Sequence, residues 1–351
     1  MELTIRSLTA GLGQLGHAVE VIAPAGSVLP GVVVHQVEGT HQVSSQLMGR
    51  DAPIELPARS VLAAMWDRVA DLHTDADVVV NLAYDWLPFY LTRWLPTPIT
   101  HIVSMGSLTD VMDTAIHDVA RRHPDRLAAH SHAQAHTYDR TAGDGGTVDA
   151  AAATSVPFRI LGGGISVEQY AVRPAAGQNP AHLGAVGRIS PEKGLEDVAA
   201  LSAQTGWPVK VWGLMQDPDY WRRVLAEHPG ARLEYCGFLS SGELQQAIGN
   251  CTALVMTPKW IEAFGLVAVE AMATGVPVVA YDRGGPAEIV VDGETGFVVP
   301  ADDLDALADA VGRIGTIDRL RCRRRVEAEY STEAFARRAE GWLLDVVGAA
   351  R

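Results

Sequence analysis

Short apolar, β-branched runs alternate along almost the whole chain with longer segments of helical periodicity. A first series of strands is predicted at residues 18–23, 32–37, 77–82, 99–104, 127–131 and 158–161. A second series is predicted at residues 183–187, 209–213, 233–236, 253–257, 277–281 and 296–299. Helices are clearest at residues 59–72, 110–122, 195–205, 264–274, 303–314 and 332–347. This alternation indicates an α/β fold, in which parallel sheets have helices on both faces.

Glycine- and proline-rich stretches predict where the chain divides. Three consecutive glycines at residues 162–164 indicate a hinge, and the Pro/Gly/Ala-rich stretch 173–180 is typical of a linker. We therefore predict two doubly wound, Rossmann-like domains, at residues 1–175 and 176–330. Residues 331–351 should form a C-terminal helix that packs back toward the first domain. Residues 139–153 have little hydrophobic bulk and are predicted to be a flexible surface loop.

Composition excludes several classes of partner. With 351 residues, 48% hydrophobic and 20% charged, the chain is long enough for two globular domains. A net charge of −14 argues against a nucleic-acid partner, and no helix pairs a basic stripe with an apolar one, so no stable membrane association is expected. The basic cluster at residues 319–325 is interpreted as a solvated helix face. Three cysteines without metal-ligand spacing indicate reduced thiols in a cytoplasmic protein.

The segment 257–272 places two carboxylates, Glu262 and Glu270, eight positions apart around the predicted start of an apolar helix. Eight helical positions rise about 12 Å, so each acid would meet one end of an elongated ligand such as a nucleoside diphosphate. Gly265 would let the backbone approach that ligand, and Lys259 adds positive charge. Alternatively, Glu262 is a first-turn acid favoured by the helix dipole and Glu270 a solvated residue. Because Glu270 has apolar neighbours, it should have a hydrogen-bond partner.

Residues 187–194 (GRISPEKG) form a second candidate element, at a predicted strand–loop–helix junction. The guanidinium of Arg188 could hold two phosphate oxygens, and Lys193 would add a compact positive charge. This combination suits a diphosphate. The alternative is a surface loop in which Glu192 and Glu196 pair with the two cations.

The candidate residues of the second domain follow the ends of different strands: Arg188, Gly213, Gly237 and Glu262. Because open doubly wound sheets bind ligands at the carboxyl ends of their strands, we expect these residues to converge on one edge. The glycine pair Gly284 and Gly285 after a further strand could admit a sugar or phosphate, although it also fits an ordinary strand-to-helix turn.

Other motifs are weaker. The glycines at residues 11–16 match the spacing of a dinucleotide fingerprint, but a helical stretch precedes them and a strand follows, which counts against an NAD-dependent oxidoreductase. The 12 histidines lack metal-ligand spacing. His101, at the end of a first-domain strand, could face a ligand or could be a packed or surface residue. Asp85 is either an acceptor-side residue or a helix cap.

Arg188 and Lys193, followed by the Glu-x7-Glu element of Glu262 and Glu270, resemble the retaining, nucleotide-sugar-dependent glycosyltransferases of family 4. The resemblance extends over nearly the whole chain and implies the GT-B fold, with two Rossmann-like domains facing a central cleft. It is greatest for the glucosyltransferases that use UDP-glucose and tetrahydrobiopterin. The stretches that support this similarity are residues 23–30, 84–88, 104–108, 218–221 and 256–288.

The resemblance also implies roles for the matched residues. Arg188 and Lys193 would bind the donor diphosphate; with Glu262, which would hold the sugar, they would be the catalytic residues. Glu270 would bind the ribose. Further donor-binding residues would be Gly187, Gly213, Gly237, Phe238, Ala263, Phe264, Gly265, Leu266 and Val267. Acceptor-side residues would be Tyr84, Asp85, His101, Ser104 and Met105. No metal ion and no cofactor are implied; the partners would be the co-substrate UDP-glucose and a small acceptor such as a reduced pterin.

Two features depart from the family pattern. Ser104 stands where many members have a histidine, and the chain begins inside the helix that follows the family's first strand and glycine-rich loop. We expect that strand to be encoded upstream, since the N-terminal sheet would otherwise have an exposed edge or an unfilled centre. The alternatives are a truncated, weakly active or non-catalytic nucleotide-sugar binder, or another enzyme on this scaffold, such as an epimerase or a hydrolase.

Overall fold

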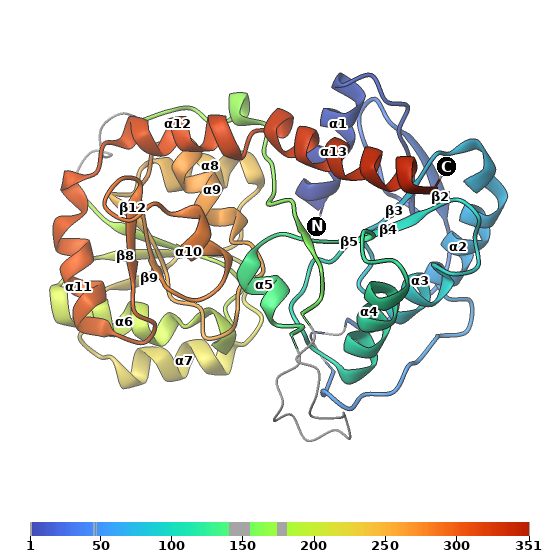
Figure 1. Cartoon of the computed structure of the whole chain (residues 1–351). Coiled ribbons are helices and arrows are strands. Elements are labelled where there is room, and N and C mark those ends of the chain that lie inside the picture. Colours follow the sequence, from blue (N-terminus) through green and yellow to red (C-terminus); the bar gives the residue numbers. More distant parts are fainter. Residues whose placement is uncertain (1, 45, 47, 140–154, 174–180, 351) are drawn as a thin grey trace. The chain divides into compact units, whose positions relative to one another are not determined.

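The computed structural model describes residues 2–44, 46, 48–139, 155–173 and 181–350 (Figure 1). The predicted loop at 139–153, apart from Asp139, and the predicted linker at 173–180, apart from Arg173, lie outside the described residues, as does the boundary predicted near 175. The chain forms two compact units. Unit 1 comprises Met1–Gly164 and Phe335–Arg351, and unit 2 comprises Ile165–Ala334.

Unit 1 contains two parallel sheets. One pairs β1 (Glu20–Pro24) with β2 (Val33–Val37). The other has the order β3-β4-β5-β6, formed by β3 (Val79–Asn81), β4 (Ile99–Ile102), β5 (Leu127–Ala129) and β6 (Arg159–Ile160). The helices are α1 (Glu2–Gln14), α2 (Val61–Leu72), α3 (Trp86–Leu91), α4 (Asp110–Arg122), α5 (His132–His136) and most of α13 (Thr332–Ala350).

The C-terminal helix α13 is part of the core of unit 1. Phe335, Trp342 and Val346 from α13 share one buried cluster with Leu8 and Leu12 of α1. The indole of Trp342 donates a 2.6 Å hydrogen bond to the carbonyl of Asp125, which orients the ring within that cluster. Burial of such apolar side chains is the main stabilising contribution to the packing of α13.

Unit 2 contains one six-stranded parallel sheet of order β12-β11-β10-β7-β8-β9. Its strands are β7 (Leu183–Val186), β8 (Val209–Trp212), β9 (Leu233–Tyr235), β10 (Ala253–Met256), β11 (Val278–Tyr281) and β12 (Gly296–Val299). Its helices are α6 (Leu195–Thr205), α7 (Pro218–Glu227), α8 (Ser241–Gly249), α9 (Leu266–Ala273), α10 (Gly285–Ile289), α11 (Leu304–Arg313) and α12 (Arg319–Glu329). The strand order reverses between β7 and β10, which makes their carboxyl ends a topological switch point.

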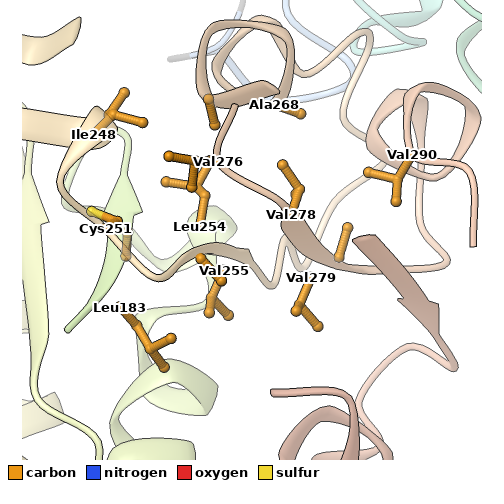
Figure 2. Packing of buried hydrophobic residues seen from close by; sticks show 14 of the residues in the cluster. Leu183, Ile248, Cys251, Leu254, Val255, Ala268, Val276, Val278, Val279 and Val290 are labelled. Carbon is orange, nitrogen blue, oxygen red and sulfur yellow. The ribbon is translucent and has the colours of Figure 1, made fainter. Parts of the chain in front are cut away.

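The core of unit 2 explains why its strands are almost continuously apolar. Figure 2 shows Leu254 and Val278 on the same side of the sheet as Ala268 of α9, whereas Val255 and Val279 point to the other side. Because side chains alternate along a strand and both faces are covered by helices, most positions of the five strands β12, β11, β10, β7 and β8 are buried, whereas the edge strand β9 is only partly covered. All twelve predicted strands are present, and the predicted α/β class with parallel sheets is confirmed.

Helix α12 contains the basic cluster at residues 319–325, which was interpreted as a solvated helix face. Arg319 is only 8% exposed, and its guanidinium donates to the carbonyls of Arg173, Cys251 and Gly249. The guanidinium of Arg323 likewise donates to backbone carbonyls of unit 2. The interpretation is therefore wrong for these two arginines, which bind backbone rather than face solvent. No helix among the described residues is both long enough and apolar enough to cross a membrane.

Candidate functional site

The candidate donor residues of unit 2 gather on both sides of the switch point. Arg188 follows β7, and Glu262 follows the adjacent strand β10. The carboxyl ends of β8 and β9 continue the same edge of the sheet, because Gly187 N donates to Trp212 O and Gly213 N donates to Gly237 O, each at 3.0 Å. The strand ends predicted to converge do lie side by side, since their strands are parallel neighbours in one sheet.

Lys193 and Glu262 form the closest contact of this edge. The ammonium Nζ lies 2.5 Å from carboxylate Oε2, and both side chains are about four-fifths buried, with exposures of 21% and 18%. The indole Nε1 of Trp260 donates a 3.0 Å hydrogen bond to the same oxygen. The Lys193 ammonium also lies 5.0 Å from the centre of the Trp260 ring. One carboxylate oxygen thus joins a cation from the β7 loop to an indole from the β10 loop.

Arg188 lies beside this group and has partners of its own. Its guanidinium donates to Oε1 of Glu192 at 2.8 Å and to Oε1 of Gln216 at 2.9 Å, and it lies 5.8 Å from the centre of the Trp260 ring. The ion pair between Arg188 and Glu192 that the alternative interpretation predicted is therefore present. The predicted pairing of Lys193 with Glu196 is wrong, because Lys193 pairs with Glu262 and Glu196 accepts a hydrogen bond from Tyr220.

Glu262 is not part of the helix that follows it. Helix α9 begins at Leu266 with Gly265 as its N-cap, so the predicted helical rise between Glu262 and Glu270 does not apply. Glu262 forms a parallel bridge with Gly284 instead, and its carbonyl accepts from the backbone N–H of Gly285 at 2.7 Å. A Cβ on Gly284, which has a φ of 86°, would lie 2.4 Å from the carbonyl oxygen of Glu262. The glycine pair therefore admits the Glu262 loop.

Glu270 is buried on α9 and has a hydrogen-bond partner, as was predicted from its apolar neighbours. It is 5% exposed, and the hydroxyl of Tyr170 donates a 3.0 Å hydrogen bond to its Oε1. Burial raises the pKa of the Glu270 carboxyl, and the Tyr170 hydrogen bond partly opposes that rise. The alternative interpretation of Glu270 as a solvated residue is wrong.

The other predicted donor residues differ in their surroundings. Phe238 is 74% exposed directly after Gly237, which leaves its ring face open to a planar ligand. Phe264 packs edge-on against Tyr330 with ring centres 5.9 Å apart, and Gly265 is buried. Ala263, Leu266 and Val267 are partly buried around the start of α9.

Lys259, which was predicted to add positive charge to the site, is paired with two carboxylates of unit 2. Its ammonium lies 2.5 Å from Oδ2 of Asp197 and 2.9 Å from Oδ1 of Asp302. Arg283 also pairs with Asp302. These ion pairs fix the start of the loop that contains Trp260 and neutralise Lys259 locally.

His101 is a core residue of unit 1, so its prediction as an acceptor-side residue is wrong. It is 0% exposed, and its ring stacks on Phe89 with centres 4.1 Å apart. The oxygen of the Asn81 side-chain amide accepts a hydrogen bond from the loop backbone, so the amide nitrogen faces His101 and donates to its Nδ1 at 3.1 Å. Because Nδ1 is an acceptor, the ring proton is on Nε2, which donates to the Thr92 hydroxyl at 2.7 Å. Burial, assisted by Arg126, lowers the pKa of His101 to about 3. The imidazole is therefore neutral.

The remaining acceptor-side candidates lie at the carboxyl ends of β3 and β4. Oδ1 of Asp85 accepts from Leu87 N at 3.2 Å and caps α3, as the alternative interpretation predicted. The Tyr84 hydroxyl donates to Gly106 O at 3.2 Å, and burial raises its pKa to about 12. Met105 contributes its carbonyl to hydrogen bonds within the unit. The buried hydroxyl of Ser104 has no hydrogen-bond partner among the described residues.

Two residues beside the candidate sites, Asp113 in unit 1 and Trp260 in unit 2, were not predicted from the sequence. Asp113 of α4 is buried and accepts from Arg50 and from Ser107, each at 2.7 Å. It resembled an ordinary first-turn acid. Trp260 could have been found from its position, since it is a tryptophan two residues before the candidate carboxylate Glu262. Within the described residues, no group of three or more His, Cys, Asp or Glu side chains is placed to hold a metal ion.

The chain is similar in sequence to known proteins, over unit 2 for a family model and over both units for a relative. Residues 168–332 match the family model described as glycosyl transferases group 1. The chain is 26% identical to the D-inositol 3-phosphate glycosyltransferase of Kribbella flavida over 90% of this chain and 82% of that protein.

Two solved structures show the same fold. AviGT4, a glycosyltransferase involved in avilamycin A biosynthesis, has a TM-score of 0.68 at 19% identity, covering 98% of this chain and 89% of its own. Anabaena HepE, solved in complex with UDP and glucose, has a TM-score of 0.66 at 15% identity, covering 93% and 99%. The predicted GT-B fold is thereby confirmed. The comparisons together support a glycosyltransferase of group 1.

Proposed function

We propose that the chain is a retaining hexosyltransferase that transfers glucose from UDP-glucose to a small soluble acceptor, a reduced pterin being the first acceptor to test. One observation supports this most strongly: Arg188, Lys193 and Glu262 meet at the switch point of the unit 2 sheet. Two cations there suit a diphosphate, and a carboxylate beside them suits sugar hydroxyls. UDP-glucose is the donor of choice because HepE, which has the same fold, binds UDP and glucose.

In the proposed reaction, the bond between the sugar C1 and the diphosphate oxygen breaks while the acceptor oxygen bonds to C1 from the same face. The departing phosphate oxygen takes the acceptor's proton, so UDP leaves with the negative charge. Arg188 and Lys193 would neutralise that charge, and the N-terminus of α9 would add to their effect. Glu262 would orient the sugar and is not assigned as a nucleophile. Because protein cations supply the positive charge, the proposal requires no metal ion.

The test is a transfer assay followed by mass spectrometry. The full chain is incubated with UDP-glucose, UDP-galactose or GDP-mannose and with several acceptors, including a reduced pterin. We expect an acceptor heavier by one hexose, with an α-linkage by NMR when the donor is α-configured. An epimerised donor, or hydrolysis alone with every acceptor, would refute the proposal. Binding of UDP-glucose by calorimetry without any product would instead identify a nucleotide-sugar binder.

A further inference from the structure

The indole of Trp260 contacts each of the three side chains to which the proposed function gives a catalytic role. Its N–H donates to Glu262 Oε2 at 3.0 Å, and its ring centre lies 5.0 Å from the Lys193 ammonium and 5.8 Å from the Arg188 guanidinium. Its position among two cations and a carboxylate calls for a physical explanation.

Charge is balanced in this site without a ligand. Lys193 is bonded to Glu262, and Arg188 is bonded to Glu192. A diphosphate bears at least two negative charges, so it competes with Glu262 for Lys193. When the diphosphate takes Lys193, Glu262 loses its only cation among the described residues. The remaining hydrogen bond to this carboxylate is then the one from Trp260.

We propose that Trp260 is a positioning residue of the donor site, whose indole N–H holds Glu262 toward the donor sugar once the diphosphate has taken Lys193. This inference rests on the proposed function. Both hydrogen bonds of the Glu262 side chain fall on Oε2, and Oε1 has no hydrogen-bond partner among the described residues. Oε1 would accept hydrogen bonds from sugar hydroxyls while Oε2 stays on the indole.

The loop that contains Trp260 is held by contacts that do not involve the ligand. The preceding residue, Lys259, is bonded through its side chain to Asp197 and Asp302 and through its backbone N–H to the carbonyl of Glu192 at 2.9 Å. On the other side, the bridge of Glu262 to Gly284 closes the loop. The indole is therefore placed before the donor arrives, and holding Glu262 costs little additional ordering.

The test compares Trp260→Phe with the wild-type chain by calorimetry, using UDP and UDP-glucose as separate ligands. Phenylalanine keeps a ring beside the two cations and removes only the N–H donor. We expect the affinity for UDP to stay within about twofold and the affinity for UDP-glucose to fall about tenfold, the usual effect of losing a hydrogen bond to a charged group. Trp94→Phe is the matched control, since Trp94 is 62% exposed before the start of β4, and neither affinity should change.

A double-mutant cycle with Glu262→Gln decides whether Trp260 acts through Glu262. We expect Trp260→Phe to change the ratio of the two affinities less than twofold in the Glu262→Gln background. Equal losses for UDP and UDP-glucose, additive effects in the cycle, or wild-type behaviour of Trp260→Phe would each overturn the proposal. If the wild-type chain binds neither ligand, the proposed function fails, and that result is obtained before any variant is compared.

Discussion

The Lys193 ammonium and the Glu262 carboxylate, which lie on loops that follow the adjacent strands β7 and β10, form an ion pair of 2.5 Å. Sixty-nine residues separate them in the chain. This pair means that the cation best placed to bind a diphosphate already has a carboxylate partner. Under the proposed function, binding of a diphosphate at this edge would be an exchange of partners, and variants of the two residues should have opposite effects on nucleotide affinity.

Glu262→Gln should bind UDP about tenfold more tightly than the wild-type chain, because the diphosphate no longer displaces a carboxylate from Lys193. The affinity for UDP-glucose should rise by a smaller factor, since the variant also loses the charged acceptor for the sugar hydroxyls. Calorimetry with both ligands measures the two effects. Glu227→Gln, an exposed residue at the end of α7, makes the same change of charge and should leave both affinities as they are. Weaker UDP binding by Glu262→Gln would contradict this prediction.

Lys193→Ala should lower turnover at saturating donor by about 100-fold, because the leaving diphosphate loses a positive charge in a partly buried site. The matched control is Lys210→Ala on β8, which removes the same charge elsewhere in unit 2. Steady-state kinetics with UDP-glucose would show the difference. Equal kinetics in the two variants would remove the assignment of Lys193 to the diphosphate.

Glu270→Gln should stabilise the protein while it weakens donor binding. Burial raises the pKa of Glu270 in the folded state, so the unfolded chain ionises first as pH rises, and the wild-type protein loses stability between the unfolded and the folded pKa. Glutamine does not ionise but can still accept the Tyr170 hydrogen bond. Thermal unfolding should show no difference in Tm near pH 4 and a Tm a few degrees higher for the variant at pH 8. A lower Tm for the variant at pH 8 would contradict the burial of an unfavourable charge.

Phe238→Ala should weaken UDP binding about tenfold if the exposed ring stacks on the nucleotide base. Because the side chain is 74% exposed, its removal should change Tm by less than about 1 °C. Calorimetry and thermal unfolding test both parts. Leu320→Ala is the control for loss of an exposed apolar side chain, since Leu320 lies on α12 and is 42% exposed. Unchanged UDP affinity in Phe238→Ala would exclude base stacking on this ring.

His101 should remain neutral from pH 5 to pH 8, with its proton on Nε2, because burial lowers its pKa to about 3. Nitrogen-15 NMR of histidine-labelled protein can measure the tautomer and the titration. A His101 resonance that moves with a midpoint between pH 5 and 8 would show that the ring is not buried as described.

The strand and helix pattern was predictable because alternation of buried strands with amphipathic helices is a local property of the sequence. The boundaries of α9 were less accurate: the segment from Glu262 to Gly265 has no helix-breaking residue until its last position, yet the bridge to Gly284 holds Glu262 outside the helix. Short helices such as α5 have too few turns to show a period.

The sequence by itself determined that Arg188, Lys193 and Glu262 would gather at one edge, because parallel strands place their carboxyl ends together. Only the tertiary structure decided which groups are partners there. The contact of Trp260 with Glu262 and the burial of His101 depend on side-chain directions and loop paths, and these follow from packing between segments distant in the chain. Such packing leaves no periodic signal in a single sequence, so the candidate residues Arg188, Lys193 and Glu262 could be named from it, whereas their partners and charge pairing could not.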